Sequence, residues 1–154
     1  MSYLPFIIVP AIVVLTAAIG SMITLTGMEW YNGITKPAWV PPGSFIGIVW
    51  TVIYTLCTAA ILITWQSKIT LPRRRLVMFL FLSNAALNIV WSFLFFGIHS
   101  ISWSVAEMLI LNISTILLIY LIWPFSKTAA ALLIPYAAWV TFATYLAYTV
   151  LTLN

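Results

Sequence analysis

Long apolar segments separated by short polar ones make up most of the chain, and each is long enough to cross a lipid bilayer. A spanning helix needs roughly 20 consecutive, mostly apolar residues. Five segments meet this requirement, at residues 4–26, 44–65, 76–98, 101–125 and 129–153. The segment at 101–125 contains one charged residue, Glu107, and the other four contain none. The pattern predicts an all-α integral membrane protein in which residues 1–154 form one bundle of five transmembrane helices.

The connections between these segments differ in charge. Those at residues 66–75 and 126–128 hold five of the six Lys and Arg residues, whereas those at 27–43 and 99–100 hold only Lys36. Basic connections remain on the cytoplasmic side of a membrane. We therefore expect the N-terminus inside and the C-terminus outside. The expected location is a bacterial cytoplasmic membrane.

Composition supports the membrane interpretation. Of the 154 residues, 64% are apolar and only 5% are charged, against about 25% charged in a typical soluble domain. A soluble enzyme, a disordered chain and a disulfide scaffold are thereby excluded. The net charge of +4 comes largely from Lys68, Arg73, Arg74 and Arg75 in one connection, which favours a topology signal over nucleic-acid binding. The lone Cys57 has no partner for an internal disulfide.

The first connection has an unusual composition. Its residues 30–43 include three prolines, two glycines, two tryptophans and a tyrosine. We expect this composition to exclude a regular helix and to favour a stiff, extended or turned path. The aromatic residues are compatible with an interfacial belt or with a lid folded over the mouth of the bundle. The Pro41-Pro42-Gly43 run favours the lid, because a belt needs no stiffening.

Polar and aromatic residues recur at helical spacing inside the apolar segments, and they predict one internal cavity. Rises of 1.5 Å per residue place most of them in the half of the bundle beneath the first connection. The stripes are Trp50 and Tyr54; Asn84, Asn88, Trp91, Ser92 and Phe95; Trp103, Glu107, Ile110 and Ser114; and Tyr136, Trp139 and Ala143. Each has a structural alternative: the tryptophans as packing, the asparagines as interhelical hydrogen-bonding residues, and Glu107 as a protonated, hydrogen-bonded carboxyl. A carboxyl inside a membrane is otherwise a functional-site hypothesis.

Several short motifs appear in a characteristic order. The first connection carries Trp30-Tyr31, Lys36-Pro37, Trp39 and Pro41-Pro42, and the later segments carry Asn88 with Trp91, Phe95-Phe96-Gly97, Trp103 with Glu107, and Pro135-Tyr136 with Trp139. Over nearly the whole chain this series resembles the translocator-protein family, whose members are also called tryptophan-rich sensory proteins or peripheral benzodiazepine receptors.

The resemblance implies a homodimer of five-helix bundles, each with a pocket covered by the first loop. The small residues Ser83, Ala85 and Ala86 are compatible with close helix contact in such a dimer. Implied ligands are porphyrins and flat aromatic amides, with a protoporphyrin-type tetrapyrrole as ligand or substrate. No cofactor, metal or nucleic acid is expected, and membrane lipid is an expected partner. The expected ligand-binding residues are Tyr31, Trp39, Pro41, Trp50, Tyr54, Asn88, Trp91, Ser92, Glu107, Met108, Trp139 and Ala143.

Three functions follow from this resemblance. The first is a membrane receptor or sensor for porphyrins and related flat aromatic or lipidic ligands. The second is a light-dependent porphyrin-degrading enzyme with Trp50 and Trp139 as catalytic residues. The third is a tetrapyrrole or sterol transporter, which five spans without an internal repeat disfavour. Sterol binding is further disfavoured because Leu146 and Tyr148 are followed by no basic residue.

Overall fold

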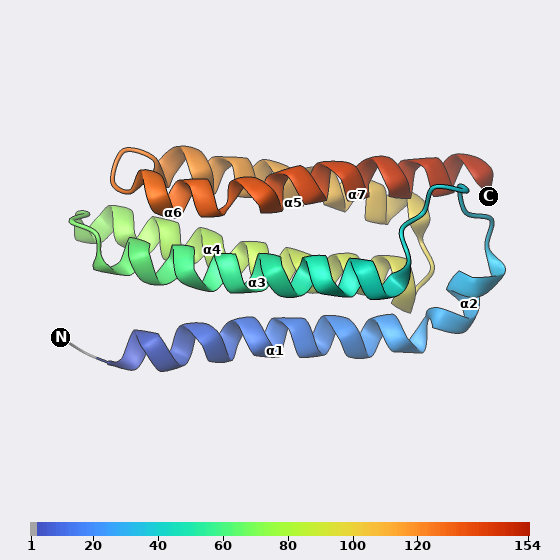
Figure 1. The fold of residues 1–154 in the computed structure, drawn as a ribbon, viewed down its shortest axis with the longest axis horizontal. Helices are drawn as coiled ribbons and strands as arrows, with labels where there is room; N and C mark the ends of the chain where they lie inside the picture. Colours follow the sequence, from blue (N-terminus) through green and yellow to red (C-terminus); the bar gives the residue numbers. More distant parts are fainter. Residues whose placement is uncertain (1–2) are drawn as a thin grey trace.

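The computed structural model describes residues 3–154 as an elongated bundle whose successive long helices run in opposite directions along its long axis (Figure 1). Five helical stretches within these residues are long and apolar enough to span a membrane. The elements in chain order are α1 (Leu4–Thr26), α2 (Met28–Gly33), α3 (Gly43–Gln66), α4 (Leu71–Ser92), η1 (Phe93–Gly97), α5 (Ile101–Ile122), α6 (Lys127–Leu132) and α7 (Ile134–Leu153). The predicted all-α membrane fold is confirmed.

The two ends of the bundle differ in what they carry. We call the end with α2, the α4–α5 connection and the C-terminus the α2 end (right in Figure 1). We call the opposite end, with the start of α1 and with Arg73, Arg74 and Arg75, the basic end.

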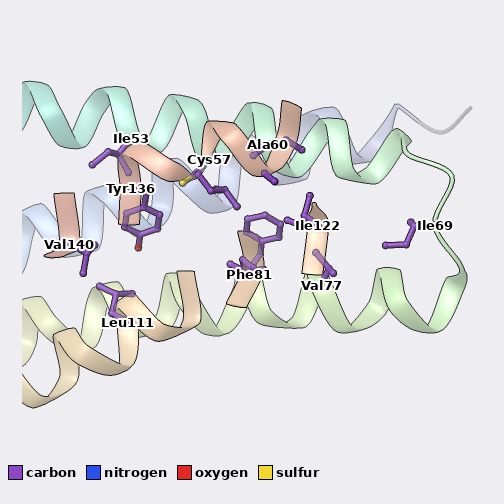
Figure 2. Packing of buried hydrophobic residues seen from close by; sticks show 14 residues of the cluster. Ile53, Cys57, Ala60, Ile69, Val77, Phe81, Leu111, Ile122, Tyr136 and Val140 are labelled. Carbon is purple, nitrogen blue, oxygen red and sulfur yellow. The ribbon is translucent and has the colours of Figure 1, made fainter. Parts of the chain in front are cut away.

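The core lies between α3, α4, α5, α6 and α7. Ile53, Cys57 and Ala60 recur at spacings of four and three, which places them on one face of α3. This face packs against Val77 and Phe81 of α4 and against residues of α5 to α7 (Figure 2). By contrast, α1 is the least buried of the long helices and packs against α3, α4 and η1. Its outward face is apolar, as a surface that contacts lipid must be.

Three predicted spans have different boundaries. The span predicted at 101–125 ends as a helix at Ile122, and two others differ because of proline and charge. Helix α4 begins at Leu71, five residues before the predicted span, because Pro72 fits the first turn of a helix and the basic residues extend past the apolar segment. The last span is two helices, α6 and α7, that meet at Leu133. Pro135 has no N–H to donate to the preceding turn, so the helix is interrupted there.

The first connection contains a helix, although its proline and glycine content predicted none. Residues Met28–Gly33 form α2, so that expectation was wrong for this stretch. The reason is that the prolines lie later, at positions 37, 41 and 42. Residues 34–42 do follow a non-helical path. The Lys36 ammonium donates to the Tyr31 and Ile34 carbonyls (2.6 and 3.2 Å) and lies 4.6 Å from the Tyr31 ring.

The non-helical segment is also fastened to the C-terminus. The Asn154 side-chain amide accepts from the Thr35 N–H (3.0 Å) and donates to the Thr35 carbonyl (2.9 Å). It donates as well to the Val150 carbonyl (2.8 Å) in the last turns of α7. One side chain therefore joins the first connection to α7 across 119 residues of sequence.

Helix α4 ends in a π-helical turn, η1, where the Ile98 N–H donates to the Phe93 carbonyl (2.9 Å). The wider turn brings Phe95 and Phe96 together into buried positions. Helix α1 ends against this turn, because Gly27 leaves no side chain between the two backbones. Turns of this kind are frequent at functional sites.

Candidate ligand-binding site and family

A chain of side-chain hydrogen bonds crosses the interior of the bundle. The Tyr54 hydroxyl of α3 donates to Asn88 Oδ1 of α4 (3.0 Å), and Asn88 Nδ2 donates to the Tyr136 hydroxyl of α7 (2.9 Å). Tyr136 donates to Asn84 Oδ1 (2.9 Å), and Asn84 Nδ2 donates to Thr115 Oγ1 of α5 (3.0 Å). Four helices are thus joined through polar groups that would be costly to bury singly.

A cavity of about 40 Å³ lies against this hydrogen-bonded chain. Its walls are Val13, Thr16, Tyr54, Cys57, Ile61, Phe81, Asn84, Ala85, Asn88, Leu118, Leu133 and Tyr136. This volume suits one or a few water molecules, whereas sites for drug-sized ligands occupy roughly 300–1,000 Å³. Of the predicted ligand-binding residues, Tyr54 and Asn88 line the cavity.

An aromatic cluster fills the seam between α3 and α7 towards the α2 end. Trp39 of the first connection stacks on Tyr145 (5.5 Å between ring centroids) and meets Phe142 at 6.0 Å. Trp139 lies 5.3 Å from Phe142 and 6.4 Å from Phe45 of α3. Helix α3 packs closely on α6, but in this half of the bundle it meets α7 through these large rings.

A second aromatic cluster surrounds η1. Trp91 stacks on Phe95 at 5.5 Å, and Trp30 approaches the edge of Phe95 at 5.4 Å. Trp30 also stacks on His99 at 4.4 Å. Tyr31 lies 6.1 Å from Phe95, and its partial burial raises the pKa of its phenol above the ordinary value because the phenolate loses hydration.

Three of the predicted site residues carry buried polar atoms without a hydrogen-bond partner. They are both carboxyl oxygens of Glu107, Nε1 of Trp91 and Nε1 of Trp139. Glu107 is 6% exposed and lies in the second turn of α5. A buried polar group without a partner costs a few kcal/mol, so these two donors and one acceptor mark candidate contact points for a ligand.

The structure places the predicted residues at several points of this interior. Trp50 contacts Tyr136 (6.1 Å) and Tyr54 (5.6 Å), which joins it to the hydrogen-bonded chain. Ser92 is buried and donates to the Asn88 carbonyl (3.4 Å). Met108 is fully buried, and Pro41 and Ala143 are half-buried.

One predicted stripe was wrong in part, and one central residue was missing from the predicted set. Trp103 and Ile110, expected to share an inward stripe with Glu107, are 69% and 56% exposed. Spacing alone does not show which side of a stripe faces inward, and both lie on its outer edge. Tyr136 was on the predicted stripe of the last span but was not assigned to ligand binding. Its spacing of three from Trp139 was the available signal.

The five apolar helices and their tryptophan-rich, partly polar interior define a helical-bundle integral membrane protein. The chain belongs to the TspO/MBR family, whose family model matches residues 6–153. It is 36% identical over 125 residues to the tryptophan-rich protein TspO of Bacillus cereus (81% of this chain, 80% of the relative). It is 35% identical over 136 residues to TspO of Archaeoglobus fulgidus (88% and 87%). It is 31% identical over 125 residues to the human translocator protein (80% and 74%). The resemblance read from the sequence is confirmed.

Proposed function

We propose that this protein is a membrane receptor or sensor that binds porphyrins and related flat aromatic ligands inside the bundle, towards the α2 end. The observation that carries the proposal is the set of unpartnered polar atoms on Trp91, Glu107 and Trp139 beside two aromatic clusters. A protoporphyrin has complementary groups: a broad aromatic face that stacks on indole rings, and carboxylates that accept from indole N–H groups.

Access to this site requires the first connection to act as a lid. The cavity of about 40 Å³ is much smaller than a porphyrin site, which needs several hundred Å³. Residues 34–42 must therefore move away from α7, which separates Trp39 from Tyr145 and breaks the two hydrogen bonds between Thr35 and Asn154. Ring contacts between α3 and α7 can then be replaced by contacts with the ligand.

We also propose that the basic end faces the cytoplasm, as the distribution of Lys and Arg favours. Ligand then enters from the outer side, where the first connection lies. Labelling single cysteines placed at positions 36 and 68 with an impermeant reagent in intact cells tests this orientation. Modification of position 68 alone would show that the basic end faces outward.

Trp91→Phe and Trp139→Phe test the binding site. Each substitution keeps most of the aromatic surface but removes one indole donor, so the Kd for protoporphyrin should rise about fivefold, or about 1 kcal/mol. The matched control is Trp103→Phe, because Trp103 is 69% exposed and outside both clusters. The measurement is a spectral titration of the purified protein in the dark.

Equal affinity in all three variants and the wild type would contradict the proposed site. The same titration repeated under illumination separates binding from chemistry. A stable absorbance spectrum supports a receptor, whereas loss of porphyrin absorbance that depends on both light and protein identifies a degrading enzyme.

Asn154→Ala tests the lid. The substitution removes both hydrogen bonds to Thr35, so residues 34–42 should leave α7 more often, and porphyrin association and dissociation should both become several-fold faster. The control is Thr152→Ala, whose hydroxyl donates only within its own helix, to the Thr149 carbonyl. Stopped-flow fluorescence quenching measures both rates. Unchanged rates in Asn154→Ala would show that opening this segment does not limit entry.

A further inference from the structure

A groove of about 380 Å³ lies at the basic end, on the opposite end of the bundle from the proposed porphyrin site. Its apolar walls come from the last turns of α5 and the chain just after it, and its one charged member comes from the first turn of α4. The lining residues are Arg73, Ile116, Ile119, Tyr120, Trp123 and Pro124.

The groove opens towards the surrounding membrane. Ile116 is 52% exposed, Tyr120 73% and Trp123 45%. Helix α5 is one of the five membrane-length helices, so this face meets lipid. Tyr and Trp at the end of a spanning helix lie at headgroup depth, whereas Ile116 lies one turn deeper, at the level of acyl chains.

Arg73 supplies the positive charge at the mouth of the groove. Its guanidinium carbon lies 4.8 Å from the centre of the Phe125 ring, and this cation–π contact holds the guanidinium in place. Within residues 3–154, no carboxylate pairs with it. The sequence contains two acidic residues, Glu29 in α2 and Glu107 in the second turn of α5, and both belong to the other end. The guanidinium therefore lacks an anionic partner among the described residues.

We propose that this groove is a binding site for one anionic phospholipid. The phosphate binds the Arg73 guanidinium, whose fixed donors suit phosphate oxygens. One acyl chain lies along Ile116 and Ile119, and Tyr120 and Trp123 flank the headgroup. The charge at the mouth and the apolar walls that continue into the bilayer together match a lipid. A soluble anion would make no use of the walls, a lipid without a phosphate would leave the charge unpaired, and a zwitterionic lipid would bring a second cation close to Arg73, Arg74 and Arg75.

Arg73→Gln and Arg75→Gln distinguish a defined site from general attraction to a basic surface. Both remove one charge from the same turn of α4, but only Arg73 lines the groove. For the detergent-solubilised protein titrated with single phospholipids in native mass spectrometry, we expect Arg73→Gln to weaken phosphatidylglycerol binding about tenfold. Arg75→Gln should change it less than about twofold, and phosphatidylcholine should bind weakly to all forms.

A second variant tests the apolar walls without changing the charge. Ile116→Trp places a large side chain in the groove from a lipid-facing position, so it should reduce phosphatidylglycerol binding while leaving thermal stability unchanged. Equal losses in Arg73→Gln and Arg75→Gln would overturn the proposal in favour of diffuse attraction. Full competition by glycerol phosphate, which has no acyl chains, would overturn it in favour of a free phosphate site.

Discussion

Gly27→Ala is expected to destabilise the protein by about 3 kcal/mol, the upper part of the range for overpacked sites. A Cβ at this position would lie 2.3 Å from the Phe96 carbonyl oxygen and 2.8 Å from Phe96 Cα. Both are backbone atoms of η1, so no side chain can rotate away to make room. The end of α1 would have to separate from η1, and the contact between these two elements would be lost.

Two other glycines provide matched controls. A Cβ on Gly20, also in α1, would meet only Ser92 Oγ at 3.4 Å, and a Cβ on Gly47 would meet nothing within 4 Å. Gly20→Ala and Gly47→Ala should therefore leave stability unchanged or raise it slightly, because alanine favours a helix over glycine. Thermal unfolding of the three variants in one detergent measures the difference. If Gly27→Ala and Gly47→Ala unfold at the same midpoint, η1 can move away from α1 without loss of stability.

Tyr136→Phe should lower the free energy of unfolding by about 2 kcal/mol. The phenol hydroxyl donates to Asn84 Oδ1 and accepts from Asn88 Nδ2, so its removal leaves two buried amide groups each short of a partner. Single interhelical hydrogen bonds in membrane proteins average about 0.6 kcal/mol. The larger value here reflects the two bonds that are lost together.

Tyr148→Phe is the control for this prediction, since Tyr148 lies on the same helix and is 54% exposed. It should unfold at the wild-type midpoint. If Tyr136→Phe also unfolds at that midpoint, water in the adjoining cavity has replaced the hydroxyl, and the direct hydrogen bonds contribute little.

The helices follow from the sequence because the bilayer fixes their length. Residues 4–26 were predicted as a span and form α1 with the same bounds. Helix α2 was missed because proline and glycine content was averaged over a segment whose first part, Met28–Gly33, contains no proline. The π-helical turn η1 has no pattern of its own, since it depends on how α1 and the aromatic rings pack around Phe95 and Phe96.

The candidate site was predictable residue by residue but not as an arrangement. Spacings of three and four put Asn84 and Asn88 on one face of their helix, and both are buried. Their shared partner Tyr136 belongs to a helix far along the chain, and only the packing of α4 against its neighbours brings the three together. For the same reason Trp103, one turn from buried Glu107, lies on the lipid-facing side.

The hydrogen bonds through Tyr136 have a direction. From Tyr54 to Asn88, Tyr136, Asn84 and Thr115, each group donates to the next, and Thr115 finally donates to the Leu111 carbonyl (2.9 Å). Each hydroxyl has a single proton to donate. Reversing the bond at Tyr54 therefore requires both amides to flip and the Thr115 hydroxyl to turn from the Leu111 carbonyl towards Asn84. The series has two self-consistent polarities, and an event at α3 that favours one of them also fixes the proton orientation on α5, across the full width of the bundle.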